Sequence, residues 1–446
     1  MRPNTLRLLL SSTSLAALAL GADAILVGHI AQAQTTINGA STSVKTSVTG
    51  DLTINSGGFL QDATKTLILI DASKNVTNSG IALASGAGGQ AINVNTTIQT
   101  TITNNINGHF TSDATTTIST VTIADAAKAT IKNTGQIANG SSAVGANHAI
   151  EFVGGNTGDL INNANGTITS VNGSALVLNS ANAAAKTFAG KIQNSGLIQA
   201  DAVDGIVINR SVISGGLAND QGGTIKITAA AVNAVTVSGA GNVFGITNSG
   251  TIQATNGTGN GIQLAGSAGL TGDIANTATG KITVVDGNGI ETIALAKLTG
   301  NITNAAGGVI ESTGNGRAVH VVGEVTGQVS NSGTIRSTGT GNSAVFVQGA
   351  IDGGIVNHNG GLIQATGTVT SAILIQGGTA DITNQSGGTI TSSSTNASGD
   401  TIRFNGGTST VSNDGTISMT GSGVAAINVN SASTVSITNE IGRAHV

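Results

Sequence analysis

The chain has 446 residues, of which 66 are Gly, but only 9% are charged, 2% are aromatic and none is Cys or Trp. Disordered chains are usually charged and rich in Pro, and this chain has a single Pro, so the composition predicts a folded protein. So few large aromatic side chains favour a narrow core of stacked Ile, Val, Leu and Ala. The formal net charge of −4 and the lack of a basic run argue against nucleic acid as a partner.

Residues 1–33 have the pattern of an export signal peptide. Arg2 and Arg7 precede the apolar run LLLSSTSLAALALGA, and the small residues AQA at Ala31–Ala33 suit cleavage before Gln34. The apolar run is short for a membrane span of about 20 residues, which disfavours the alternative of an uncleaved anchor helix. An exported chain without Cys has no disulfides, so packing and hydrogen bonds must stabilise it.

A short motif recurs through residues 34–439. It consists of an apolar residue, any residue and Asn, followed two to four positions later by Gly, as in IQNSGLIQA at Ile192 and VSNDGTISM at Val411. We place its Asn, at a mean spacing of about 27 residues, at Asn55, Asn78, Asn104, Asn133, Asn163, Asn194, Asn219, Asn248, Asn276, Asn304, Asn331, Asn357, Asn384, Asn413 and Asn439.

A second stretch of alternating apolar residues follows in most units, such as GIQLA at Gly261, AVHVV at Ala318 and AVFVQ at Ala344. Each unit therefore predicts two or three short strands, and no unit shows helical periodicity. One unit cannot bury its apolar residues alone, but stacked units can. The sequence predicts an all-β fold, a right-handed parallel β-helix (β-solenoid) of about 14 coils of roughly 27 residues. In one such coil, we expect the following residues to face inward: Ile246, Ile252, Ala254, Ile262 and Leu264.

We interpret the motif Asn as a structural residue. Asn tolerates left-handed backbone angles in turns, and Asn side chains stacked in register can form a ladder of amide hydrogen bonds. The Gly that follows is expected to supply a positive φ. The alternative, that these Asn belong to a calcium or sugar site, is disfavoured because one Asn per coil is typical of turn chemistry. The turn and ladder role is assigned to Asn133, Asn194, Asn248, Asn304, Asn331, Asn384 and Asn413.

With its export signal, its mature part free of Cys and Pro and its N-S-G-T-I type repeats, the chain resembles the passenger domain of a bacterial autotransporter (type V secretion). The resemblance covers residues 34–439. It implies the cell surface or outer membrane of a Gram-negative bacterium, or secretion, with export through a C-terminal translocator β-barrel. The sequence contains no run of barrel strands with aromatic girdles, so we expect the barrel to be missing from this fragment.

The sequence provides no catalytic, cofactor-binding or metal-binding residue that we would assign. His109, His148, His320 and His358 lie in different repeats without ligand spacing, and we interpret them as isolated surface residues. GGNTGD at Gly154 occurs once and is typical of a Gly-rich turn.

Acidic residues recur within a few coils and could align on one face, namely Asp273, Asp286, Glu291, Glu311 and Glu324. Basic residues nearby are sparse, at Lys281, Lys297 and Arg317. We therefore expect no enzyme, but a non-catalytic adhesin or aggregation factor. Its partners would be glycans or proteins of a host or neighbouring cell, and it could also self-associate. A carbohydrate-active β-helix enzyme, a lyase or hydrolase, is the alternative.

The last residues, 440–446, depart from the repeat. After Asn439 the motif requires Ser or Asp and then Gly, but the chain reads EIGRAHV. One coding of these residues contains AGATCGGAAGAGCACACGTC, which looks like the start of a sequencing adapter. We therefore expect 440–446 to be a non-native tail without function, and the natural gene to continue with further coils and a barrel.

Overall fold

The computed structural model describes residues 34–41, 50–62, 66–72, 74–86, 88–115, 117–143, 145, 147–179, 186–209, 211–239, 241–368, 371–395, 399–422 and 425–440. The predicted export signal, residues 1–33, and residues 441–446 of the predicted tail lie outside these ranges. Throughout them the regular structure is strand, and no helix able to cross a membrane is found there.

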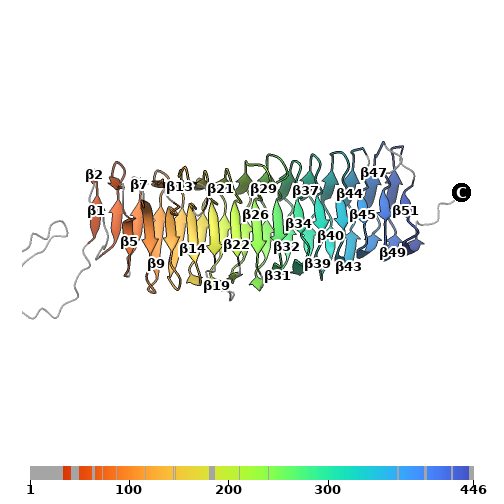
Figure 1. The fold of residues 1–446 in the computed structure, drawn as a ribbon, viewed down its shortest axis with the longest axis horizontal. Coiled ribbons are helices and arrows are strands. Elements are labelled where there is room, and N and C mark those ends of the chain that lie inside the picture. Colours follow the sequence, from red (N-terminus) through yellow and green to blue (C-terminus); the bar gives the residue numbers. More distant parts are fainter. Residues whose placement is uncertain are drawn as a thin grey trace, which may run out of the picture. The chain divides into compact units, whose positions relative to one another are not determined.

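The described residues between 34 and 440 form a parallel β-solenoid whose strands build three long sheets, called A, B and C (Figure 1). Sheet A runs from β1 (Thr35–Ile37) to β52 (Ser433–Asn439), and sheet B from β2 (Ala40–Ser41) to β50 (Thr416–Met419). Sheet C runs from β5 (Thr66–Ile70) to β51 (Ile427–Val429). The stack consists of about 13 turns of about 28 residues. The prediction of an all-β parallel solenoid is confirmed.

One coil visits the sheets in the order A, B, C and A again. In the middle of the chain these strands are β28 (Ile246–Asn248), β29 (Thr251–Ala254), β30 (Ile262–Ala265) and β31 (Gly269–Thr271). Each pairs in parallel with the corresponding strand of the next coil, without a register shift here. The same position of the repeat therefore stacks on itself from coil to coil.

The core lies between the three sheets, where apolar residues stack from coil to coil and some positions repeat the same residue type. Ile252 pairs with Ile225 in the coil before and with Ile282 in the coil after. The five residues expected to face inward in this coil are all at most 1% exposed, as predicted. β-Branched side chains pack well on a pleated surface, which explains the abundance of Ile and Val at these positions.

A row of Asn side chains runs through the interior at the ends of the sheet A strands, and all of them except the last, Asn439, are buried. Each Asn donates its Nδ2 amide to the Oδ1 of the Asn in the next coil at 2.7–2.9 Å. We call this row the Asn ladder, and its members are Asn78, Asn104, Asn133, Asn162, Asn194, Asn219, Asn248, Asn276, Asn304, Asn331, Asn357, Asn384, Asn413 and Asn439. All seven Asn to which the sequence assigned a turn and ladder role lie in it. The amides also donate to backbone carbonyls of the following turn or strand, as Asn276 does to Gly280 and Asn248 to Lys281.

Two of the positions predicted for this row are wrong by one residue. Asn162 belongs to the Asn ladder, whereas Asn163 donates to the Thr134 hydroxyl at 2.9 Å. Ile54 pairs with Asn78 in register, so Ile54 occupies the ladder position of its coil, and Asn55 is exposed. In each case an Asn directly after the true ladder position also fits the motif, so the motif was placed one residue too late.

The expected positive φ is confirmed only at the first Gly of repeats with two consecutive Gly, such as Gly222 with φ of 87°, and is wrong for the Asn and for the other motif Gly. Ala126, Ala231 and Leu295 are the only residues other than Gly with positive φ among those described, so the ladder Asn do not adopt left-handed angles. Nor does the motif Gly250 have a positive φ. Its requirement for Gly is steric, because a Cβ atom at Gly250 would lie 2.2 Å from the Gly223 carbonyl oxygen.

The connections from sheet A to sheet B come in two lengths. In a short turn, Asn-x-Gly, the Gly follows the ladder position by two residues, and in a long turn by four. Short turns follow Asn78, Asn133, Asn194, Asn248, Asn331 and Asn413, and long turns follow Ile54, Asn104, Asn162, Asn219, Asn276, Asn304, Asn357 and Asn384. A long turn is closed by its own hydrogen bond, as from Gly223 N–H to Asp220 O at 2.8 Å. Every short turn follows a long one, and its Gly fits closely against the carbonyls of that long turn.

Candidate functional site

The outer face of sheet C carries a row of polar and aromatic side chains over five successive coils. The strands are β26 (Val235–Ser238), β30, β34 (Ile290–Thr292), β38 (Val319–Val321) and β42 (Val345–Val347). Because side chains alternate between the two faces of a strand, the second residue of each of these strands points outward. In register, this row is Thr236, Gln263, Glu291, His320 and Phe346.

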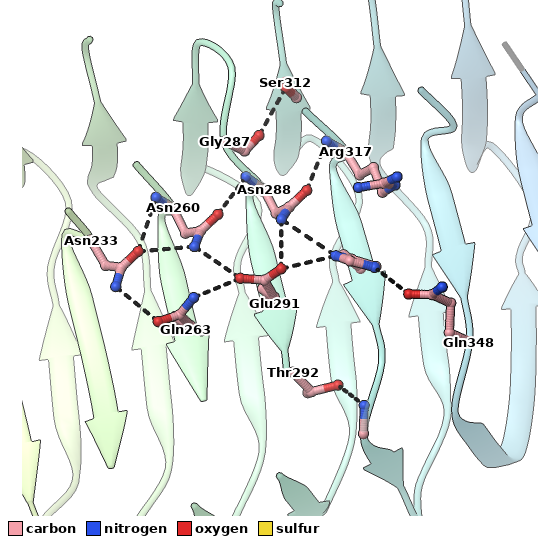
Figure 2. Close-up of polar contacts among 12 residues, drawn as sticks. Asn233, Asn260, Gln263, Gly287, Asn288, Glu291, Thr292, Ser312, Arg317 and Gln348 are labelled. Atoms are coloured by element: carbon pink, nitrogen blue, oxygen red, sulfur yellow. Dashed lines mark hydrogen bonds and ion pairs between the residues drawn. The ribbon is translucent and has the colours of Figure 1, made fainter. Parts of the chain in front are cut away.

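Glu291 is the centre of the hydrogen-bond network in this row (Figure 2). Its Oε1 accepts from Asn288 Nδ2 at 2.8 Å and lies 2.9 Å from His320 Nδ1. Its Oε2 accepts from Gln263 Nε2 at 2.7 Å and from Asn260 Nδ2 at 3.0 Å. The carboxylate is thus surrounded by four nitrogen partners.

The charge state of Glu291 follows from these partners. Burial raises the pKa of its carboxyl, but the hydrogen bonds from His320 and Gln263 and the charges of His320 and Arg317 together hold that pKa below its ordinary value. A carboxylate that accepts several hydrogen bonds is stabilised in its ionised form. Glu291 is therefore an anion held in place, with its acceptor positions occupied.

A second row of amides beside the strands holds these donors in position. Asn233, Asn260 and Asn288 occupy the same place in three successive coils, and each side-chain oxygen accepts from a backbone N–H of the next coil (Figure 2). The row starts at Asp204, whose Oδ1 accepts from the Asn233 N–H at 2.7 Å, and ends at the N–H of Arg317. We call Asn233, Asn260 and Asn288 the outer amide row.

His320 is not the isolated surface residue that we predicted. Its side chain is only 10% exposed, because it pairs with Glu291 and its ring stacks on Phe346 with centroids 5.1 Å apart. Its Nε2 lies 3.3 Å from Gln348 Oε1. The other three histidines of the described chain lie apart from this network, His109 near Gln136 and His358 near Ser330. His148 accepts from the Ser174 N–H and is largely buried, so the surface prediction is wrong for it as well.

Arg317 lies at the edge of this network. Its guanidinium is centred 4.3 Å from the Phe346 ring centroid, a distance typical of cation–π contacts. Burial lowers the pKa of Arg317, and the neighbouring Glu291 charge opposes that effect. In Figure 2 the guanidinium points away from the carboxylate, and only the backbone N–H of Arg317 is joined to the network.

The other predicted acids do not gather around Glu291. Glu311 pairs with Arg336 on sheet B, and Glu324 pairs with Lys297 on sheet A. Both Asp273 and Asp286 accept from backbone N–H groups of the next coil, and Lys281 is exposed on sheet B. The acids therefore do not align on one face, because Glu291, Glu311 and Glu324 lie on three different sheets. The described part of the chain holds no group of three or more His, Asp or Glu suited to a metal ion.

The GGNTGD segment forms a turn and a short strand beside Asp125. The Asp125 carboxylate accepts from the Gly155 N–H at 2.7 Å and pairs with Lys186 at 3.3 Å. Those two contacts, the Gly155 hydrogen bond first, lower the pKa of Asp125. Gly154 has φ of 77°, which explains a Gly at that position.

The cluster around Glu291 was missed although the sequence contained a signal for it. The stretches GIQLA and AVHVV were recognised as equivalent parts of different coils, and GIETI at Gly289 fits between them. Aligning the three would have placed Gln263, Glu291 and His320 side by side. Spacing along the chain does not reveal the cluster, because neighbours in a solenoid are one coil apart.

Comparison with known proteins identifies no relative, since no family model, curated protein or solved structure matches this chain.

Proposed function

We propose that the protein is an exported cell-surface solenoid, the passenger of an autotransporter, and that it acts as a non-catalytic adhesin or aggregation factor. The observation that carries this proposal is the long uninterrupted stack of three parallel sheets, whose outward rows are mostly small or uncharged polar residues. Such a surface offers many weak contacts along one axis, and their combination gives avidity. Glycans or proteins of another cell are the proposed partners.

The arrangement around Glu291 gives little support to the alternative, a carbohydrate-active enzyme. A general acid requires a raised pKa, whereas that of Glu291 is lowered. The other carboxylates considered from the sequence are engaged elsewhere, Glu311 with Arg336 and Glu324 with Lys297. Glu291 is better suited to hold neighbouring side chains in place than to exchange a proton.

Binding of the purified full chain to an array of glycans and matrix proteins tests the proposal. We expect saturable binding without any change to the ligand. The same ligands are then incubated with the protein and examined for shortened or unsaturated products. Saturable turnover that is abolished by Glu291→Gln would contradict the adhesin and support the enzyme.

Export is tested separately by fractionating cells that express the full gene. We expect the mature protein at the cell surface or in the medium, with Gln34 as its first residue. A cytoplasmic protein that retains residues 1–33 would exclude the export proposal, whatever the array shows.

A further inference from the structure

Arg317 is held in place by contacts that leave its hydrogen-bonding groups unused. Its backbone N–H donates to Asn288 Oδ1 at 3.1 Å, and its guanidinium lies over the buried ring of Phe346. Within the described part of the chain, no hydrogen bond or ion pair involves that guanidinium. Glu291 is near enough to influence its pKa, but the oxygens of Glu291 already have four other partners.

Arg336 shows what a satisfied arginine looks like in the same protein. Its Nε donates to Glu311 Oε1 at 2.7 Å, and this contact raises the pKa of Arg336. Arg317 is half-buried, so part of its hydration is lost, yet it has no acceptor in exchange. A half-buried guanidinium without an acceptor is unusual, because desolvated charges are normally paired.

A fixed guanidinium with free N–H groups is a site for a planar oxyanion. Its donors match the two oxygens of a carboxylate, and holding the side chain in place before binding reduces the entropy lost on binding. Exposed polar residues lie close in sequence or in register, since Asn315 precedes Arg317 by two residues, Thr340 donates to the Asn315 side chain, and Gln348 follows Phe346 by two residues. The Phe346 ring is only 4% exposed, which leaves little apolar surface there for a peptide side chain.

We propose that Arg317 binds the carboxylate of an acidic sugar in a surface polysaccharide, with the Gln348 amide available to the sugar hydroxyls. This assignment rests on the proposed binding role, and it names the class of ligand that one segment of the surface recognises. Glu291, His320 and Asn288 act as positioning residues, because they hold the aromatic support and the backbone of Arg317.

Titration of the full chain with glucuronate tests the site directly, with glucose as the neutral control and chemical shift changes or calorimetry as the readout. We expect glucuronate to bind and glucose not to bind. Arg317→Gln should weaken glucuronate binding by at least about tenfold, and Arg317→Lys should also weaken it, because an ammonium lacks the planar pair of donors. Arg336→Gln is the matched control and should leave the affinity unchanged.

Three outcomes would overturn the inference. Glucuronate binding that survives Arg317→Gln, or that falls equally with Arg336→Gln, would show that general charge and not this site attracts the anion. Preference for an oligoglutamate peptide over glucuronate would assign the site to a protein ligand. Array binding to neutral glycans without glucuronate binding would exclude the acidic-sugar site but leave the adhesin proposal standing. Conversely, glucuronate binding without any array ligand would support the Arg317 site but contradict the adhesin proposal.

Discussion

The protein contains two rows of stacked amides, one inside the solenoid and one outside, and they differ in regularity. The Asn ladder repeats the same residue and the same hydrogen bond at 2.7–2.9 Å from coil to coil. The outer amide row has only three members before Arg317 replaces Asn, and its side chains bind a carboxylate as well as each other. The regular row makes the same contact in each coil from Asn78 to Asn439, while the irregular row belongs to one place on the surface.

This difference separates residues that maintain the repeat from residues that interrupt it. A buried amide left without a partner costs free energy, so selection for folding alone can retain the Asn ladder. Folding gives no such reason to place Glu291, His320 and Arg317 in consecutive coils of an otherwise weakly charged chain. Variants in the Asn ladder should accordingly impair stability, whereas variants around Glu291 and Arg317 should mainly impair binding.

The largest effect is expected from a charge in the core that both rows depend on. Ile252 is 0% exposed, and Ile252→Asp would both remove buried apolar surface and introduce an unpaired carboxyl. We expect it to destabilise the coils around it by more than about 4 kcal/mol. Hydrogen exchange should show lost protection in the neighbouring coils, and the outward Gln253→Asp should not. Similar protection in both variants would contradict the stacked core.

A smaller but definite loss is expected when one member of the Asn ladder is removed. Asn248→Ala leaves Asn219 without one acceptor and Asn276 without its donor, both in the interior. We expect the free energy of unfolding to fall by about 2 to 4 kcal/mol. Chemical denaturation measures the change, with the outward Thr247→Ala as the control. Equal effects of the two variants would mean that the ladder contributes nothing to stability.

An intermediate effect of acid is expected at His148, which belongs to neither row. Burial lowers the pKa of His148 from 6.5 to about 4, and its Nδ1 accepts from the Ser174 N–H, so the folded state favours the neutral ring. Between about pH 6.5 and 4 the unfolded chain then binds more protons than the folded chain. The free energy of unfolding should therefore fall by at most about 3 kcal/mol as the pH is lowered through this range.

His148→Asn, which keeps an acceptor, should reduce this dependence on pH in denaturation curves recorded between those two values. His109→Asn serves as the control. If the dependence is the same with and without His148, the buried neutral ring does not govern it.

The smallest loss of stability is expected in the outer network. Glu291→Gln replaces one acceptor oxygen with a donor that faces other donors, and we expect a cost of about 1 to 2 kcal/mol. Glu311→Gln, in the pair with the more exposed Arg336, should cost less than about 1 kcal/mol. Glucuronate affinity adds a second measurement, because Glu291→Gln should lower it by disturbing the support of Arg317. A stability loss as large as that of Asn248→Ala would mean that both rows serve the fold.

The repeat made most of the fold predictable. Period-two alternation placed Ile246, Ile252 and Leu264 inward, because any other phase would expose them. The phase failed at Asn162 and Asn163, where two neighbouring Asn fit the motif and only stacking decides between them. The reason for Gly250 also required the structure, because the obstructing Gly223 carbonyl belongs to the previous coil.

The site was far less predictable, because its residues interrupt the repeat instead of following it. His320 is separated in the sequence from Glu291 by one full coil, and its burial depends on Phe346 in the following coil. Neither contact produces a spacing that resembles a known catalytic or metal motif. Alignment of coils could have identified the row, but not the guanidinium of Arg317, whose free donors depend on how its neighbours are already bonded.

The two turn lengths limit how such a chain can gain or lose coils during evolution. Because each short turn fits against a long turn, removing the coil that carries the long turn after Asn162 would place the short turns after Asn133 and Asn194 in contact. Removing one of the two adjacent long-turn coils, after Asn276 or Asn304, leaves every short turn behind a long one. By this rule a single short-turn coil can be lost and a single long-turn coil can be duplicated, whereas the loss of a lone long-turn coil or the duplication of a short-turn coil requires a neighbouring coil to change with it.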